Sequence, residues 1–210
     1  MSTAAEYAEQ GTSEWLMERC GKATASEAAT VMVKGKGPHG LGAGAQTYAM
    51  EIAAEILTGV TAVHGACQAT DWGNRSEEQA RLAYERESGL EIATAPFIEH
   101  VAFDRIGGSP DGLVGDDGGV EIKCPFATKN HVQTIHSGRM PKEHKPQVQA
   151  LLWVTDRKWW DFVSYDPRMP QGCDVFIQRQ HRDEAYIEDM AARYEALLRY
   201  VDEIVEACRG

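Results

Sequence analysis

The sequence lacks the features that mark membrane, secreted and zinc-binding proteins. No apolar run approaches the roughly 18 residues needed to span a bilayer. The first ten residues, MSTAAEYAEQ, have neither the basic start nor the apolar stretch of a secretory signal. The 5 cysteines include no C-x-x-C pair and the 7 histidines show no H-E-x-x-H spacing, which argues against a zinc site. These absences predict no membrane partner, and free thiols in a reducing cytoplasm.

An excess of basic residues is also missing. The chain carries 21 Lys and Arg against 32 Asp and Glu, and its net charge is -11. Any DNA binding must therefore use a local basic surface or metal ions, because the overall charge repels nucleic acid. The length of 210 residues and the hydrophobic content of 43% suit a single domain over residues 1–210.

Apolar periodicity and turn residues predict helices in the first part of the chain and strands in the middle. Helices are expected at residues 4–19, 46–57, 72–88 and 142–155, and a further helix opens at 24–27 with Thr24 or Ser26 as its cap. Strands are expected at 95–103, 111–114, 120–124, 159–165 and 174–178, with Gly107 and Gly108 breaking the first. Residues 35–44 and 59–70 are expected to be loops, and the first lacks the G-K-[ST] ending of a phosphate-binding loop.

The tail from Asp183 predicts a long amphipathic helix, about 183–207, whose apolar residues recur at steps of three and four: Ile187, Met190, Tyr194, Leu197, Val201 and Ile204. This stripe either packs on the protein's own sheet, which is favoured, or forms a contact between subunits. With a helical part at about 1–90 and a core at about 91–180, the order of elements predicts an α/β (α+β) fold with a mixed central β-sheet flanked by helices.

The informative stretch is Ser109-Pro110-Asp111-Gly112-Leu113 followed, after a glycine-rich turn, by Val120-Glu121-Ile122-Lys123-Cys124-Pro125. Side chains alternate along a strand, so Glu121 and Lys123 share one face while Val120, Ile122 and Cys124 share the apolar one. A hairpin brings Asp111 beside Glu121. The sequence therefore predicts two carboxylates and one amine on one face of a sheet.

Two adjacent carboxylates repel each other unless a cation lies between them, and their hard oxygens suit Mg²⁺ or Mn²⁺. Such an ion polarises a phosphodiester and activates water, while a neighbouring lysine orients that water and offsets charge. Asp-Gly alone is a common turn pair, and Glu-x-Lys alone is often a solvated ion pair. Their combination at this spacing favours phosphodiester cleavage.

This pattern resembles the metal-binding motif of the PD-(D/E)xK nuclease superfamily, with its restriction-endonuclease-like core. Further motifs resemble the lambda exonuclease family of viral recombination (alkaline) exonucleases, in order from about Trp15 to Met169. They are Trp15, Arg19, Gly21, Thr24-Ala25-Ser26-Glu27, Trp72-Gly73, Glu121-Ile122-Lys123-Cys124-Pro125-Phe126, Gln147-Val148-Gln149, Trp153-Val154-Thr155 and Tyr165-Asp166-Pro167-Arg168-Met169.

The resemblance implies an Mg²⁺-dependent exonuclease, with two ions per site, that processively digests one strand of linear duplex DNA from its 5′ end. It releases 5′-phosphomononucleotides and leaves a 3′ overhang for annealing. The resemblance also implies a homotrimeric ring around DNA, a single-strand annealing protein as partner, and action in the cytoplasm of a bacterial host. A restriction-type endonuclease on the same core and a catalytically idle DNA-binding scaffold are the alternatives.

Carried over position by position, Asp111, Glu121 and the backbone carbonyl of Ile122 would be metal ligands, and Lys123 would position the nucleophilic water. Glu77, preferred over its neighbour Glu78, would reach the metal site. Gln147 would lie beside the reacting phosphate, and without the resemblance it reads equally well as a surface glutamine.

The same comparison implies that Arg19, Ser26 and Ser109 form a pocket for the 5′-terminal phosphate, since Arg offers a planar fork of donors. Lys129 stands where the family has an arginine, so it keeps the charge without the fork. The chain also departs from the family at residues 68–71, Gln-Ala-Thr-Asp, where an apolar residue is expected to separate the strands.

Charge is unevenly distributed along the chain. Residues 122–146 hold five Lys or Arg and three His (Lys123, Lys129, Arg139, Lys142, Lys145, His131, His136 and His144) against the single acid Glu143, whereas residues 183–206 hold eight Asp or Glu against two Arg. This segregation predicts one DNA-facing surface and one solvent-facing surface.

Overall fold

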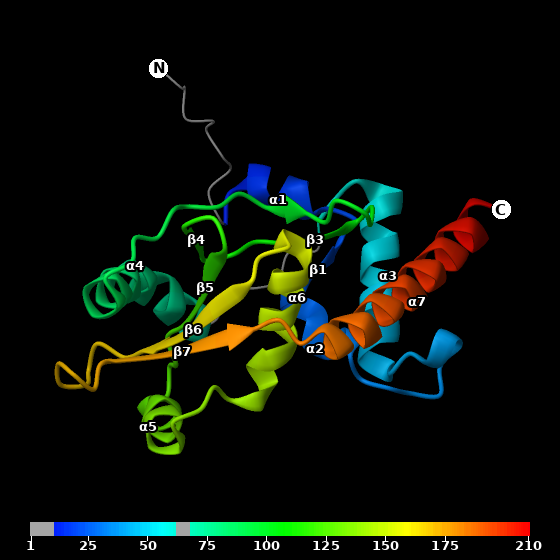
Figure 1. Cartoon of the computed structure of the whole chain (residues 1–210). Coiled ribbons are helices and arrows are strands. Elements are labelled where there is room, and N and C mark those ends of the chain that lie inside the picture. Colours follow the sequence, from blue (N-terminus) through cyan, green and yellow to red (C-terminus); the bar gives the residue numbers. More distant parts are fainter. Residues whose placement is uncertain (1–10, 62–67) are drawn as a thin grey trace.

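The computed structural model describes residues 11–61 and 68–210, without the side chains of 68–70 and 74. Part of the expected helix 4–19, part of the loop 59–70, and Cys67 lie outside the described residues. The described chain forms a mixed α+β fold with a three-stranded and a four-stranded sheet flanked by helices (Figure 1). The predicted fold class is confirmed.

The four-stranded sheet carries the predicted motif. Its order is β4 (Gly112–Val114), β5 (Gly118–Lys123), β6 (Trp159–Tyr165) and β7 (Val175–His181). The β4–β5 and β6–β7 pairs are antiparallel and the β5–β6 pair is parallel, so the sheet is mixed. Parallel strands need a long crossover, and here it contains α5 (Thr128–Ser137), η3 (Lys142–His144) and α6 (Lys145–Thr155).

Helices cover both faces of this sheet. On one face, Ala80, Ala83 and Tyr84 of α4 (Gln68–Ser88) pack with Val120 and Ile122. On the other face, α6 contacts β6 and shares a core with the buried Trp160. The predicted apolar face of the 120–124 strand is therefore confirmed. Helix α4 ends where predicted, because Gly89 follows it with a φ of 70° that suits glycine.

The three-stranded sheet corrects the expectation that Gly107 and Gly108 break a strand. Its order is β1 (Ala23–Thr24), β3 (Ile106–Gly108) and β2 (Ile98–Glu99), so both glycines lie inside β3. A Cβ at Gly107 would collide with the Phe97 ring, and one at Gly108 would lie 2.8 Å from Leu151 Cδ2. These glycines allow close packing on the strand and do not mark a turn. The strand expected at 95–103 is reduced to the two residues of β2.

Helices α3 (Ala43–Thr58) and α4 extend beyond the predicted 46–57 and 72–88, whereas the helix expected at 4–19 is shorter within the described residues. Helix α1 is Ser13–Arg19, and residues 25–31 form η1 (Ala25–Glu27) and α2 (Ala28–Val31). Thr24, one of the two predicted cap residues, is the N-cap residue of η1, but its side chain makes no capping hydrogen bond, and the Ser26 hydroxyl contacts Thr24 and Arg19. The loop at 35–44 contains a short 3-10 turn, η2 (Pro38–Gly40).

The predicted C-terminal helix is α7 (Glu184–Arg209), and the side chain of Asp183 caps it by accepting a hydrogen bond from the Tyr186 backbone. Its apolar stripe belongs to the protein's own core. Helix α7 lies mainly against the helices α3, α2 and α6 (Figure 1), and Tyr194 of the stripe also donates a hydrogen bond to the Thr24 carbonyl in β1. None of the described helices is long and apolar enough to cross a membrane, and the described cysteines are free.

Candidate active site

The strand pattern brings the predicted carboxylates and lysine together. Glu121 is only 1% exposed, and its Oε1 atom lies 2.5 Å from Nζ of Lys123. Burial lowers the pKa of Lys123, but the carboxylates of Glu121 and Asp111 outweigh burial and raise it overall. The ammonium group is therefore charged at neutral pH, which suits orienting water and offsetting negative charge.

Asp111 directly precedes β4, the first strand of the hairpin. Its Oδ2 atom accepts a hydrogen bond of 2.6 Å from the backbone N–H of Ile122. Burial and the adjacent Glu121 raise the pKa of Asp111 well above its usual value, while Lys123 and the Ile122 N–H oppose that rise. Glu121 thus opposes the ionisation of Asp111, and a divalent cation between the two carboxylates would relieve that repulsion.

The donor set fits Mg²⁺. The Oε2 atom of Glu121 is buried and has no hydrogen-bond partner among the described residues, so it is free to bind a cation. Within residues 11–61 and 68–210, no group of three or more His, Cys, Asp or Glu side chains is placed to hold a metal. Mg²⁺ does not require one, because it commonly binds one or two carboxylates and completes its shell with water and phosphate oxygens.

Arg81 is a residue that the sequence reasoning missed. From α4 it donates a short hydrogen bond to the backbone carbonyl of Asp111, and it also contacts Oε1 of Glu77 at 3.3 Å. Glu77 is close enough to contribute to the raised pKa of Asp111. The structure therefore places Glu77 near the site but paired with Arg81. In the sequence Arg81 is an ordinary helix arginine, and its role depends on how α4 packs.

Arg19, Ser26 and Ser109 come together in space although they lie far apart in sequence. The Arg19 guanidinium donates to Ser109 Oγ at 3.2 Å and to Ser26 Oγ at 3.4 Å. It lies 4.3 Å from the centre of the Trp15 ring, whose Nε1 also donates to Ser109. Burial lowers the pKa of Arg19, so an anion is a favourable partner there. Arg19 and Ser26 line a cavity of about 560 Å³.

The remaining predicted residues are less closely tied to the carboxylates. Gln147 is half-buried in the first turn of α6, and Lys129 is exposed in the first turn of α5. Residues 68–70, where the chain departs from the family, have undescribed side chains. Gln149, two residues after Gln147, has a structural role. Its Nε2 donates a hydrogen bond to the His181 carbonyl, and its Oε1 accepts one from the Asp183 N–H.

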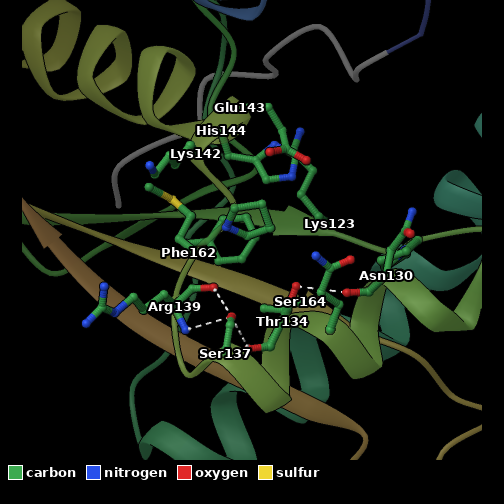
Figure 2. Close-up of a pocket in the computed structure, with 15 residues that line it drawn as sticks. Lys123, Asn130, Thr134, Ser137, Arg139, Lys142, Glu143, His144, Phe162 and Ser164 are labelled. Carbon is green, nitrogen blue, oxygen red and sulfur yellow. Dashed lines mark hydrogen bonds between the residues drawn. The ribbon is translucent and has the colours of Figure 1, made fainter.

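A second cavity of about 690 Å³ adjoins Lys123 between α5 and η3 (Figure 2). Arg139, Lys142 and His144 of the predicted basic segment line it. His131 does not belong to a DNA-facing surface as expected. Its ring is fully buried between Ser164 Oγ and the Cys173 carbonyl, at 2.8 and 2.9 Å.

The loop after β5 is held by Arg168, whose role the sequence pattern at 165–169 does not indicate. Arg168 donates to the carbonyls of Pro125 and Phe126 and pairs with the buried Asp166. Its guanidinium lies 4.2 Å from the centre of the Trp72 ring. These contacts fix the chain directly after Lys123 to the Tyr165–Met169 segment.

Comparisons with known proteins agree with this geometry. The model of the YqaJ-like viral recombinase domain matches residues 14–158. The structure is similar to an alkaline exonuclease from Laribacter hongkongensis, with a TM-score of 0.86 and 37% identity over 94% of this chain and 96% of that one. The same exonuclease in complex with dAMP gives a TM-score of 0.85 at 37% identity and the same coverage.

A phage-related exonuclease from Haemophilus somnus shares the fold, with a TM-score of 0.70 at 19% identity over 89% of this chain and 96% of that one. None of the curated proteins matches the chain in sequence.

Proposed function

The chain belongs to the YqaJ-like viral recombinase family, the lambda exonuclease family, and on that premise we propose that it is an Mg²⁺-dependent 5′→3′ exonuclease for linear duplex DNA. One observation carries the proposal. Ser109, which binds Arg19, is two residues from Asp111, so the arginine cluster and the carboxylates adjoin each other. An anchored 5′ phosphate and a cleavage site at this short separation favour removal of one nucleotide at a time.

The residues have distinct roles in this mechanism. Arg19, Ser26 and Ser109 bind the 5′-terminal phosphate and set the register of the strand. Asp111, Glu121 and the Ile122 carbonyl would hold Mg²⁺, and the bound ion would polarise the phosphodiester and activate water. Lys123 orients the attacking water, and Gln147 and Glu77 are proposed to contact the phosphate and the metal site. The exonuclease relative bound to dAMP supports a 5′-mononucleotide as product.

The assay compares linear duplex that carries a 5′ phosphate, linear duplex with a 5′ hydroxyl, and covalently closed circular plasmid, each with Mg²⁺ or EDTA. We expect nucleotide release from linear DNA with Mg²⁺ only, and none from the circle. Cutting of the circle would identify an endonuclease, and binding without release would identify an idle scaffold. Lys123→Ala should abolish release while the circular dichroism spectrum is unchanged, and normal digestion by this variant would contradict the site.

We also propose the assembly that the family suggests: a homotrimeric ring around DNA that digests processively and hands its 3′ overhang to a single-strand annealing protein in the bacterial cytoplasm. Sedimentation velocity tests the trimer directly, and a monomer at working concentration contradicts it. Dilution into excess competitor DNA after initiation tests processivity, because a processive enzyme continues on its first substrate.

A further inference from the structure

The register between β5 and β6 determines what lies beside the catalytic lysine. Phe162 pairs with Glu121 and Ser164 pairs with Lys123 in this parallel ladder. Paired residues point to the same face of a sheet, so Phe162 and Ser164 share the face that carries the carboxylate and the amine. Both line the cavity next to Lys123.

The arginine cluster and this cavity lie on opposite flanks of β5. Ser109 precedes β4, which pairs with one edge of β5, whereas Phe162 and Ser164 lie in β6, which pairs with the other edge. A strand whose 5′ phosphate is bound at Arg19 passes the carboxylates next. Its continuation on the 3′ side then reaches the cavity beside Lys123.

The cavity has the chemistry of a nucleotide site. The His144 ring stacks on Phe162, with centroids 5.1 Å apart and planes 24° apart, and it lies beside Lys123 (Figure 2). Burial and the neighbouring Lys123 lower the pKa of His144 to about 4, so the imidazole is neutral at pH 7. Lys142 and Arg139 add two cations to the lining, against the single acid Glu143 among the described residues that line the cavity. A neutral ring and a basic rim suit a base and its phosphate.

The rim is also held in place. Ser137 Oγ donates to the carbonyls of Thr134 and Arg139, and the Met140 N–H donates to the Gln178 side chain at 2.6 Å. These bonds tie the end of α5 to β7. A fixed cavity of about 690 Å³ lies within the range of small-ligand sites.

We propose that this cavity binds the nucleotide on the 3′ side of the cleaved bond, with its base on the His144 ring and the phosphate that links it to the following nucleotide near Arg139 and Lys142. The inference rests on the proposed exonuclease function and adds a second nucleotide subsite to it. The site holds the next nucleotide in register while the first is released.

The test is single-turnover release of the first nucleotide from 5′-phosphorylated duplexes that are intact, abasic at nucleotide 2, or abasic at nucleotide 6. For the wild-type chain, we expect about tenfold slower release with the abasic site at nucleotide 2, since base stacking on an aromatic ring is lost, and no change at nucleotide 6. His144→Ala should be about tenfold slower on intact duplex and insensitive to the abasic site. His144→Phe should retain the wild-type pattern.

His181→Ala is the control for loss of one histidine, because His181 is exposed and does not line the cavity. Equal abasic penalties in the wild-type chain and His144→Ala, or wild-type rates for His144→Ala, overturn the proposal. Failure of His144→Phe at an unchanged melting temperature also overturns it, since imidazole chemistry would then be required. If His144→Ala does not fold, the wild-type profile decides, and a missing penalty at nucleotide 2 refutes the subsite. An inactive wild-type chain refutes the exonuclease function instead.

Discussion

Nζ of Lys123 lies 2.5 Å from Oε1 of Glu121, although the two residues are separated by Ile122 in the same strand. Strand alternation puts both side chains on one face, and the buried carboxylate holds the ammonium beside the site where water would attack. The second oxygen of Glu121 is not used by this pair. The site can therefore bind a cation without first breaking its internal ion pair.

Asp111→Asn should separate metal binding from folding. The amide oxygen can still accept the Ile122 N–H, whereas alanine would leave that group unsatisfied at a cost of about 1–3 kcal/mol. Mg²⁺ at a hundred times its dissociation constant should stabilise the wild-type chain by about 2.7 kcal/mol, or about 5–10 °C in melting temperature. Thermal melts in MgCl₂ and in EDTA check this, and the same rise in the variant would argue against Asp111 as a ligand.

Arg19→Ala should slow digestion of 5′-phosphorylated ends by about ten- to a hundredfold, because charge-assisted hydrogen bonds to the phosphate are lost. Ends with a 5′ hydroxyl should be affected much less. On 5′-phosphorylated ends, the rate of Arg19→Lys should lie between those of the wild-type chain and Arg19→Ala, since lysine keeps the charge but loses the planar fork. Initial rates on the two kinds of end provide the measurement. Similar losses on both would show that Arg19 does not recognise the phosphate.

Arg81→Met tests whether Arg81 positions Asp111. The variant removes the hydrogen bond to the Asp111 carbonyl and leaves Glu77 unpaired, so kcat should fall by about tenfold with little change in KM. The free energy of unfolding should fall by about 1–3 kcal/mol. Arg75→Met, an exposed arginine on the same helix, is the matched control and should resemble the wild-type chain. A loss confined to stability would indicate a purely structural role.

Arg168→Met should destabilise the chain in a pH-dependent way. Burial raises the pKa of Asp166, but the hydrogen bonds from Arg168 outweigh burial and lower it overall. A lowered carboxyl pKa stabilises the fold above about pH 4 and loses that effect as pH falls through the folded-state pKa. The variant should lose about 1–3 kcal/mol at pH 7. Urea unfolding of both proteins at pH 7 and pH 3.5 checks this. If the difference in unfolding free energy between the wild-type chain and the variant is as large at pH 3.5 as at pH 7, the loss comes from the Trp72 contact.

Local rules were sufficient for the hairpin that carries Glu121 and Lys123. Two-residue alternation, the glycine-rich turn and the apolar Val120 and Ile122 determine which way Glu121 and Lys123 point. These are short-range properties of the backbone. The same holds for β6, whose predicted span matches the structure, and for the end of α4 at Gly89.

Local rules failed where packing decides. Helix α5 was not predicted, because its span TKNHVQTIHS has few apolar residues and ends in polar ones. Gly107 and Gly108 were interpreted as a strand break. The side chains that leave no room for a Cβ there, Phe97 and Leu151, cannot be identified from the local sequence. His131 read as a basic surface residue, but its partners Ser164 and Cys173 come from distant segments.

The sequence by itself determined the hairpin chemistry and, through its motifs, the family, because both depend on residue types at fixed short spacings. Only the tertiary structure decided that Arg19 reaches Ser26 and Ser109, that Arg81 supports Asp111, and that His144 stacks on Phe162 beside Lys123. Each of these contacts joins separate elements, and their approach depends on how helices pack on the two faces of the sheet, which no local pattern encodes.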